Sequence, residues 1–306
     1  MADLVPLFKI DLKNEKKNIT SMCLGSNGFF YAANYYDNYI RVFDQDGNLK
    51  FTFGSKGSEN SNFLHPKKLC FGPNGLLYVC DLSDHRIQVF DQDGHFKFTF
   101  GSEESENGRF LYPLKIKFGP NDLLYVCYIN TNYIKVFDQN GDFKFTFSLE
   151  EKENIQLRII EGLCLGSNGL LYSSNNWDHN IQVFDQYGNF KFTFGSKGSE
   201  NGNFLHPLEI CFSPSGFLYV CDAYNVRFQV FDQDGHFKFT FNSGRSATGE
   251  IFFIDELFFG PNNLLYIYNS RNKNISVLQQ RKHQSLYQIL AFSLFETKNN
   301  KILLKK

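Results

Sequence analysis

Seven cysteines are the residues in this 306-residue chain best suited to bind a metal or form cross-links, so their spacing is the first test of its chemistry. They form two series that recur at multiples of 47 residues: Cys23, Cys70, Cys164 and Cys211, and then Cys80, Cys127 and Cys221. The corresponding positions of other copies hold different residues, namely Lys117, Phe258, Ala33, Ser174 and Tyr268. A disulfide or a metal cage does not tolerate such replacements. We therefore expect small buried hydrophobic side chains, with no metal site and no cofactor.

Paired aspartates are the second group with potential metal chemistry. The motif Asp-x-Asp-Gly, which begins some calcium loops, occurs at Asp44, Asp91 and Asp232. A full calcium loop needs further oxygen ligands and a distal acidic residue, whereas a strand-like segment with lysine follows here. The motif is thus interpreted as a hairpin turn. The chain also lacks a Gly-x-Ser-x-Gly nucleophile motif and a phosphate-binding loop, so we expect no enzyme activity.

The charge balance argues against a general attraction to polyanions. Lysine and arginine number 31 and aspartate and glutamate 32, which gives a net charge of -1. Such a chain has no global affinity for nucleic acid or anionic membranes. The N-terminal residues contain no apolar run of signal-peptide length, and we expect a cytoplasmic protein that does not bind membranes.

A period of 47 residues organises the whole sequence. The tetrad Val-Phe-Asp-Gln begins at Val42, Val89, Val136, Val183 and Val230, and a degraded copy begins at Val277. The six copies also show a longer period, because residues 22–66 match 163–207 at 32 of 45 positions but match 69–113 at only 25. This pattern indicates three units that were later doubled.

Each unit predicts four short strands. In the second copy the apolar runs are 69–71, 76–80, 87–90 and 96–100, with turn residues between them. Asp93-Gly94 predicts a two-residue type I′ turn between the last two runs. Four-stranded units of this length cannot bury both faces alone, and radial stacking solves the problem. We predict an all-β, six-bladed β-propeller with four antiparallel strands per blade.

Ring closure has two candidate strands. Residues 8–12, within an N-terminal segment 1–19, have the alternation of the missing outer strand of blade 6, and residues 286–292 compete for the same place. We favour the N-terminal strand. The predicted domain boundaries are 20–295 for the propeller and 296–306 for a C-terminal tail.

The repeat unit LLYVCDLSDHRIQVFDQDGHFKFTFGSEESENGRFLYP, residues 76–113, resembles the NHL repeat. The shared features are a strand ending in Asp, an Arg-Ile pair, Val-Phe-Asp, an x-Gly turn, Phe-Gly and Phe-x-x-Pro. The resemblance covers about residues 20–280. The Asp and Arg of the pattern occur together only as Asp81 with Arg86 and as Asp222 with Arg227. The resemblance implies the fold rather than a function. Because the chain contains no RING or B-box segment, a ubiquitin-ligase role would need a catalyst supplied by another chain.

The loops that join the second and third strands of each copy differ most between copies, and they predict a recognition surface. Their content of tyrosine, tryptophan and arginine is typical of binding hot spots. The predicted partner-binding residues are Tyr35, Tyr36, Tyr39, Arg86, Tyr133, Trp177 and Arg227. The alternative is that these loops vary without constraint and that Arg86 and Arg227 brace their own blades.

Charged residues on the innermost strands are the second candidate site. Lys68 and Lys115 lie on neighbouring blades, and Glu209 and Glu256 lie on blades roughly opposite. Such a channel mouth could orient a zwitterionic ligand, or it could be a solvated rim.

The function favoured by the sequence is a monomeric, non-catalytic scaffold that binds a protein through the variable loops. Single-stranded RNA is the alternative partner, because related NHL propellers bind RNA on a basic, aromatic face. A metal-dependent lyase or lactonase, known among six-bladed propellers, is less favoured. The predicted innermost strands contain no histidine, and the seven histidines are scattered over turns and loops.

Overall fold

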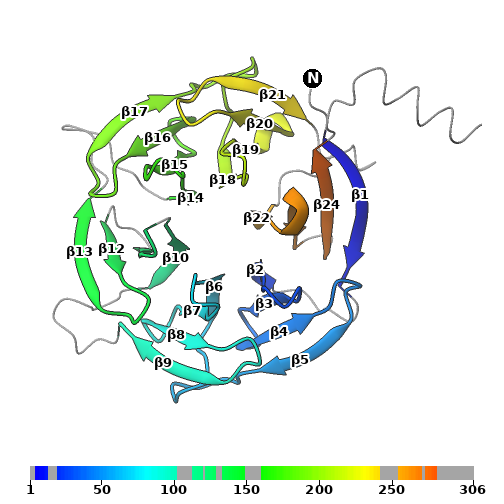
Figure 1. Cartoon of the computed structure of the whole chain (residues 1–306), viewed down its shortest axis with the longest axis vertical. Coiled ribbons are helices and arrows are strands. Elements are labelled where there is room, and N and C mark those ends of the chain that lie inside the picture. Colours follow the sequence, from blue (N-terminus) through cyan, green and yellow to red (C-terminus); the bar gives the residue numbers. More distant parts are fainter. Residues whose placement is uncertain are drawn as a thin grey trace, which may run out of the picture.

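The computed structural model describes residues 4–12, 19–101, 112–119, 121–128, 133–148, 160–241, 254–270 and 273–280. Its strands form six sheets of four antiparallel strands, arranged as blades around a central channel (Figure 1). The predicted six-bladed β-propeller is therefore confirmed. The other strand proposed for ring closure, 286–292, and the predicted tail, 296–306, lie outside the described residues.

Every blade runs from an innermost strand at the channel to an outermost strand at the rim. Blade 1 contains β2 (Ile19–Leu24), β3 (Phe30–Asn34), β4 (Tyr39–Phe43) and β5 (Leu49–Phe53). Blade 2 contains β6 (Pro66–Phe71), β7 (Leu77–Asp81), β8 (Arg86–Phe90) and β9 (Phe96–Phe100). Blade 3 contains β10 (Pro113–Phe118), β11 (Leu124–Tyr128), β12 (Tyr133–Phe137) and β13 (Phe143–Ser148).

The second half repeats this order. Blade 4 contains β14 (Gly162–Leu165), β15 (Leu171–Asn175), β16 (Asn180–Phe184) and β17 (Phe190–Phe194). Blade 5 contains β18 (Pro207–Phe212), β19 (Leu218–Asp222), the 3-10 turn η1 (Ala223–Asn225), β20 (Arg227–Phe231) and β21 (Phe237–Phe241). Blade 6 contains β22 (Glu256–Phe259), the 3-10 turn η2 (Pro261–Asn263), β23 (Leu264–Asn269), β24 (Asn274–Gln280) and, at its edge, β1 (Leu4–Asp11).

The N-terminal strand thus supplies the outermost strand of blade 6. β1 pairs antiparallel with β24, from Leu4 opposite Gln280 to Asp11 opposite Asn274. It also contacts blade 1 through the turn glycine of that blade. The turn glycine of blade 2, Gly94, lies so close to Phe53 of blade 1 that a Cβ atom would be 2.8 Å from the ring, whereas Gly47 of blade 1 lies against the backbone carbonyl of Asp11 in β1.

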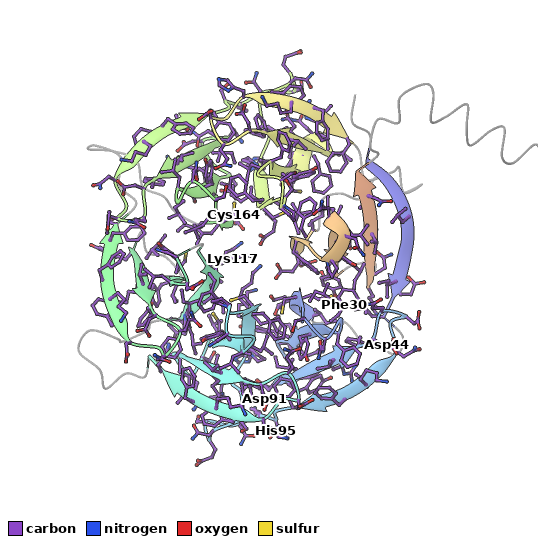
Figure 2. All side chains as sticks on the ribbon, in the orientation of Figure 1. Phe30, Asp44, Asp91, His95, Lys117 and Cys164 are labelled. Carbon is purple, nitrogen blue, oxygen red and sulfur yellow. The ribbon has the colours of Figure 1, made fainter. Side chains whose placement is uncertain are left out.

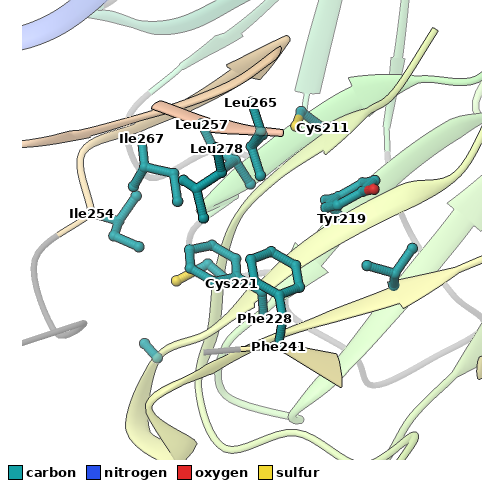
Figure 3. Close-up of a cluster of buried hydrophobic side chains, with 12 residues drawn as sticks. Cys211, Tyr219, Cys221, Phe228, Phe241, Ile254, Leu257, Leu265, Ile267 and Leu278 are labelled. Atoms are coloured by element: carbon teal, nitrogen blue, oxygen red, sulfur yellow. The ribbon is translucent and has the colours of Figure 1, made fainter. Parts of the chain in front are cut away.

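The hydrophobic core is divided among the interfaces between neighbouring blades. Figure 3 shows the interface of blades 5 and 6, where each blade contributes one set of buried side chains. The members are Cys211, Tyr219, Cys221, Ala223, Phe228, Val230 and Phe241 from blade 5, and Ile254, Leu257, Leu265, Ile267 and Leu278 from blade 6. Each fully buried large apolar side chain contributes about 1.5 to 3 kcal/mol relative to exposure. Packing between blades therefore fixes the frame on which the loops stand.

The hairpin turns of blades 1 to 5 differ from the predicted type I′ turn, because only the glycine of each turn has a positive φ. In blade 2 only Gly94 of the turn has a positive φ, whereas a type I′ turn needs two such residues. The Asp91 side chain explains the difference, because its Oδ1 accepts the N–H groups of Asp93 (3.0 Å) and His95 (2.9 Å). These bonds favour a type I turn followed by a left-handed glycine, with a register shift at Phe90.

Candidate functional site

The variable loops and the connections between blades lie on one face of the ring, called the loop face below. Backbone hydrogen bonds join the two kinds of segment, from Ser83 N–H to Leu64 O (3.0 Å) and from Tyr224 N–H to Leu205 O (3.1 Å). The turns between the first and second strands and between the third and fourth strands lie on the opposite face, called the turn face. On this face neighbouring blades meet, since Asn27 N–H of blade 1 donates to Gln92 Oε1 of blade 2 at 3.1 Å.

Exposed aromatic side chains gather on the loop face. Tyr36 is 67% exposed and Trp177 60% exposed, and Tyr133 is exposed as well. Two further exposed tyrosines, Tyr112 and Tyr224, belong to the same face although they were not among the predicted residues. Together these five are called the loop-face aromatics: Tyr36, Tyr112, Tyr133, Trp177 and Tyr224.

Histidines support several of these rings at the blade junctions. The ring centroids of His85 and Tyr112 are 4.4 Å apart, and those of His206 and Tyr224 are 4.5 Å apart. His206 also contacts His179 at 4.6 Å. Tyr112 occupies the same repeat position as His206, one place after Leu205 in the equivalent connection. Comparing the connections at the 47-residue offset could have found Tyr112 in the sequence.

The other two predicted tyrosines of blade 1 are engaged within the protein. Tyr35 is half-buried and stacks on His65 with a centroid distance of 4.7 Å. The Lys67 ammonium lies 5.5 Å from the centroid of the same ring. Tyr39 donates a hydrogen bond to Asp37 Oδ2 at 3.1 Å. Tyr35 therefore holds Tyr36 in place, with the two rings edge to face at 4.8 Å.

The two predicted arginines brace their blades. Arg86 Nε donates to Asp81 Oδ2 at 3.1 Å, and its terminal nitrogen donates to the carbonyls of Glu59 and Asn62, both at 3.1 Å. Asp81 is fully buried, so its charge requires this partner. Blade 5 repeats the arrangement with Arg227, Asp222, Glu200 and Asn203. Both guanidinium groups thus fasten the preceding inter-blade connection.

The four predicted channel residues meet one another inside the channel. Lys68 Nζ lies 3.2 Å from Glu209 Oε1 and 2.7 Å from Glu256 Oε1, and Lys115 Nζ lies 2.7 Å from Glu209 Oε1. Lys68, Glu209 and Glu256 are buried, and Lys115 is nearly so. Because Lys68 and Glu209 stand on opposite blades, their contact spans the channel. These four residues are called the channel network.

Mutual attraction outweighs burial in the channel network. Burial acts to lower the pKa of Lys68, but the carboxylates of Glu209 and Glu256 raise it above its ordinary value. Burial acts to raise the pKa of Glu209, but the ammonium groups of Lys115 and Lys68 lower it to about 2. The charges of Lys68 and Glu209 are therefore retained near neutral pH, and the network pairs two basic with two acidic side chains.

The comparison with protein families rests on the blade that carries Asp81 and Arg86. The model of the NHL repeat matches residues 63–90, which include the end of the first connection and the first three strands of blade 2. The chain contains an NHL repeat. The resemblance, which the sequence suggested for about residues 20–280, is confirmed for residues 63–90, and the brace of Asp81 and Arg86 lies in this segment. The comparison with curated proteins found no match.

Solved structures share the propeller fold at low sequence identity. Virginiamycin B lyase from Staphylococcus aureus is 14% identical with a TM-score of 0.62, and the match covers 93% of this chain and 90% of the lyase. A streptogramin B lyase is 13% identical with a TM-score of 0.56 and coverage of 92% and 98%. A protein of unknown function from Bacteroides thetaiotaomicron is 14% identical with a TM-score of 0.65 and coverage of 92% and 76%. These similarities show the fold alone.

Two clusters of potential metal ligands occur among the described residues of this NHL propeller, and both lie in hairpin turns at the rim. One consists of Asp91, Asp93 and His95, and blade 5 repeats it as Asp232, Asp234 and His236. Asp91 Oδ2 already lies 2.7 Å from Lys97 Nζ. Burial opposes the shift, but hydrogen bonds from Lys97 and His95 lower the pKa of Asp91 to about 2. The Asp91 carboxylate thus stabilises the hairpin turn and pairs with Lys97 of the strand that follows it.

The described part of the chain includes no helix that is long and apolar enough to cross a membrane.

Proposed function

We propose that this NHL propeller is a non-catalytic scaffold that binds a protein partner through the loop-face aromatics. The observation that carries the proposal is the exposure of five large aromatic side chains on one face: Tyr36, Tyr112, Tyr133, Trp177 and Tyr224. Their rings bring large, rigid contact area at a small entropic cost. Packed blades and bonded connections hold the loops beneath them, so few groups need to be ordered on binding.

The charges on the loop face favour protein over RNA. Arg86 and Arg227, which lie at the ends of variable loops, are bound to buried aspartates. The variable loops also carry the carboxylates of Asp37, Asp84 and Asp178. A surface that binds RNA needs cations that are available to the phosphates and few carboxylates that repel those phosphates. The aromatic anchors are therefore assigned to a protein with an apolar or mixed surface.

The test compares two loop-face variants with a matched variant of the turn face. A partner is first isolated with the wild-type propeller, and its affinity is then measured for Tyr36→Ala, Trp177→Ala and Tyr187→Ala. Tyr187 is as exposed as Trp177 but lies in the hairpin turn of blade 4. We expect each loop-face change to weaken binding at least tenfold, as hot-spot residues do, and Tyr187→Ala to leave it unchanged.

Equal affinity for all three variants and the wild type would reject the loop face as the binding site. Loss of the bound material on ribonuclease treatment, with a steep salt dependence, would assign the face to RNA instead. The circular dichroism of each variant must match that of the wild type, since these exposed side chains contribute little to the core. The monomeric state, the cytoplasmic location and a separate ubiquitin-ligase chain stay predictions.

A further inference from the structure

One hydrogen bond, repeated in blades 1, 2 and 4, fastens a variable loop to the connection that follows its blade. A side chain of the loop accepts the backbone N–H of a residue 27 positions later. The pairs are Asn38 Oδ1 with His65 N–H (2.8 Å), His85 Nδ1 with Tyr112 N–H (3.1 Å) and His179 Nδ1 with His206 N–H (3.1 Å). This hydrogen bond is called the loop latch below.

The backbone on both sides of the loop latch is held in an unusual conformation. In blade 4, His179 and His206 have φ values of 56° and 55°, in the left-handed region that residues with side chains adopt at a cost. The His206 carbonyl also accepts the N–H of Ala223 in blade 5 at 3.4 Å. The latch therefore ties the loop of blade 4 to a connection that blade 5 holds as well.

The acceptor differs chemically between blade 1 and blade 4. A backbone N–H can only donate, so Nδ1 of His179 must carry a lone pair, and the ring must be neutral with its proton on Nε2. A protonated ring has N–H groups at both positions, and the one at Nδ1 would face the N–H of His206. The Asn38 amide oxygen accepts at any pH. Protonation thus breaks the latch of blade 4 but leaves that of blade 1 intact.

The surroundings of His179 disfavour its protonated form while the latch is closed. The charged and titratable groups around it are His206 and Lys197 of the connection, Asp178 of its own loop, and Asp222 of β19, which is paired with Arg227. Burial, followed by the charges of His206 and Lys197, lowers the pKa of His179, against the smaller effect of the two aspartates. As the pH falls below the ordinary value of 6.5, the open state therefore takes up the proton first, and the latch weakens.

The loop latch lies next to an exposed aromatic side chain in both blades. Trp177 comes two residues before His179, and Tyr36 comes two residues before Asn38 at the same repeat position. The ring of His206 also contacts Tyr224, with the centroids 4.5 Å apart. Opening of the latch of blade 4 would therefore free the loop that carries Trp177, while the loop of Tyr36 stays fixed.

We propose that His179 is a pH-sensitive latch, whose neutral ring holds the loop of Trp177 in place and whose protonated ring releases it. Mild acid then weakens the affinity of the loop face through this anchor alone. The effect on affinity rests on the proposed function, whereas the opening of the latch requires no partner. The two are therefore tested separately.

The first test compares the hydrogen exchange of two amides within one molecule by NMR spectroscopy. His65 and His206 both lie in the sequence Phe-Leu-His-Pro, so their unprotected amides exchange at the same rate. Between about pH 7.5 and about pH 5, we expect the protection of His206 relative to His65 to fall by about fivefold or more. His179→Asn gives blade 4 the acceptor of blade 1 and should keep the ratio constant. Asn38→His should make the protection of His65 sensitive to acid.

His95→Asn is the control for the loss of an imidazole elsewhere. His95 lies at the outer rim of the ring (Figure 2), its side chain is 74% exposed, and blade 1 has Asn48 at the same position. This variant should keep the pH dependence of the wild type. A wild-type ratio that does not change with pH would overturn the latch, and so would an equal fall in the wild type and His179→Asn. If His179→Asn does not fold, a His65 amide that stays protected in acid in Asn38→His would overturn it.

The second test measures the affinity of the isolated partner for the wild type and Trp177→Ala at the same two pH values. The loss caused by Trp177→Ala should shrink from about tenfold or more at the higher pH to about threefold or less at the lower one. In the His179→Asn background the loss should be the same at both. A loss in the wild-type background that does not change with pH would overturn the regulation of binding. Failure of any partner to bind the loop face would reject the proposed function, and the amide ratio would still decide on the latch.

Discussion

Blades 2 and 5 are copies of one another in their outer parts and opposites at the channel. Residues 89–100 and 230–241 have the same sequence, and the bonds of the arginine to the buried aspartate and to two carbonyls are repeated. Arg86 also pairs with Asp84, where blade 5 has Asn225. Their innermost strands carry Lys68 in one case and Glu209 in the other. Blade 3 and blade 6 show the same reversal with Lys115 and Glu256.

Half-turn symmetry explains why this reversal matters. Each residue lies three blade positions from its counterpart in a ring of six, so the counterparts face one another across the channel. Identical residues there would bring like charges together. The frame tolerates a repeated sequence because each blade packs only against its neighbours, whereas Lys68 contacts its own counterpart, Glu209, across the channel. Duplication can therefore preserve the blade interfaces, but the charged residues at the channel must differ between the two halves.

The largest expected effect comes from making blade 5 like blade 2 at this position. Glu209→Lys would place a third ammonium beside Lys68 and Lys115 and leave both without their shared carboxylate. We expect the free energy of unfolding to fall by about 3 to 5 kcal/mol, as for a broken buried ion pair. Urea denaturation of the variant and the wild type measures the loss.

The matched control inverts the whole channel network. Lys68→Glu, Lys115→Glu, Glu209→Lys and Glu256→Lys together make each of the three contacts again one between opposite charges. This fourfold variant should recover most of the stability lost by Glu209→Lys alone. A fourfold variant that is less stable than the single one would show that the charge pattern is not what the position requires.

The brace should show a somewhat smaller effect that is equal in the two blades. Arg86→Met or Arg227→Met leaves a fully buried aspartate without its cation, which costs about 3 kcal/mol. Thermal and urea unfolding should give losses for the two variants that agree within about 1 kcal/mol. Unequal losses would mean that the ion pair of Arg86 with Asp84 (2.8 Å), which blade 5 lacks, adds measurably to the brace of blade 2.

Blade 4 supplies the control for the brace. Its residues at the same positions are Asn175 and Asn180, which carry no charge. Replacing Asp81 and Arg86 of blade 2 with this pair removes the buried carboxylate together with its partner. The double variant should therefore be less destabilised than Arg86→Met.

The smallest of these effects is a dependence on acid pH. Because the pKa of Glu209 is lowered from 4.5 to about 2 in the folded protein, the unfolded state takes up the proton first as the pH falls. The stabilisation from this group is complete above pH 4.5 and is lost between pH 4.5 and 2. The stability difference between the wild type and Glu209→Gln should thus shrink by about 1 kcal/mol per pH unit in this range. A difference that does not change from pH 5 to pH 3 would contradict the assigned ionisation of Glu209.

Much of the fold could be predicted because it repeats. The Val-Phe-Asp-Gln tetrad and the alternating Phe residues report local backbone structure, and six copies of each unit reinforce the interpretation. The turn type could not be predicted from Asp93-Gly94, because it depends on hydrogen bonds from the Asp91 side chain.

The candidate site was less accessible to sequence reasoning. Lys68 and Glu209 could be placed at the channel, but their contact depends on the width of the ring, which no local pattern reports. The role of Arg86 depends on the carbonyls of a connection more than 20 residues away. Tyr112 was missed because its importance comes from exposure beside His85 rather than from its loop.

The pairing of β1 with β24 has a consequence for how the protein is made. During synthesis the strand Leu4–Asp11 leaves the ribosome before the other strands of the propeller, yet its partner Asn274–Gln280 follows all of them. The strand Leu4–Asp11 must wait as an unpaired β-segment until then, and such segments are prone to aggregate. A chaperone that shields this segment would therefore assist the final step of assembly.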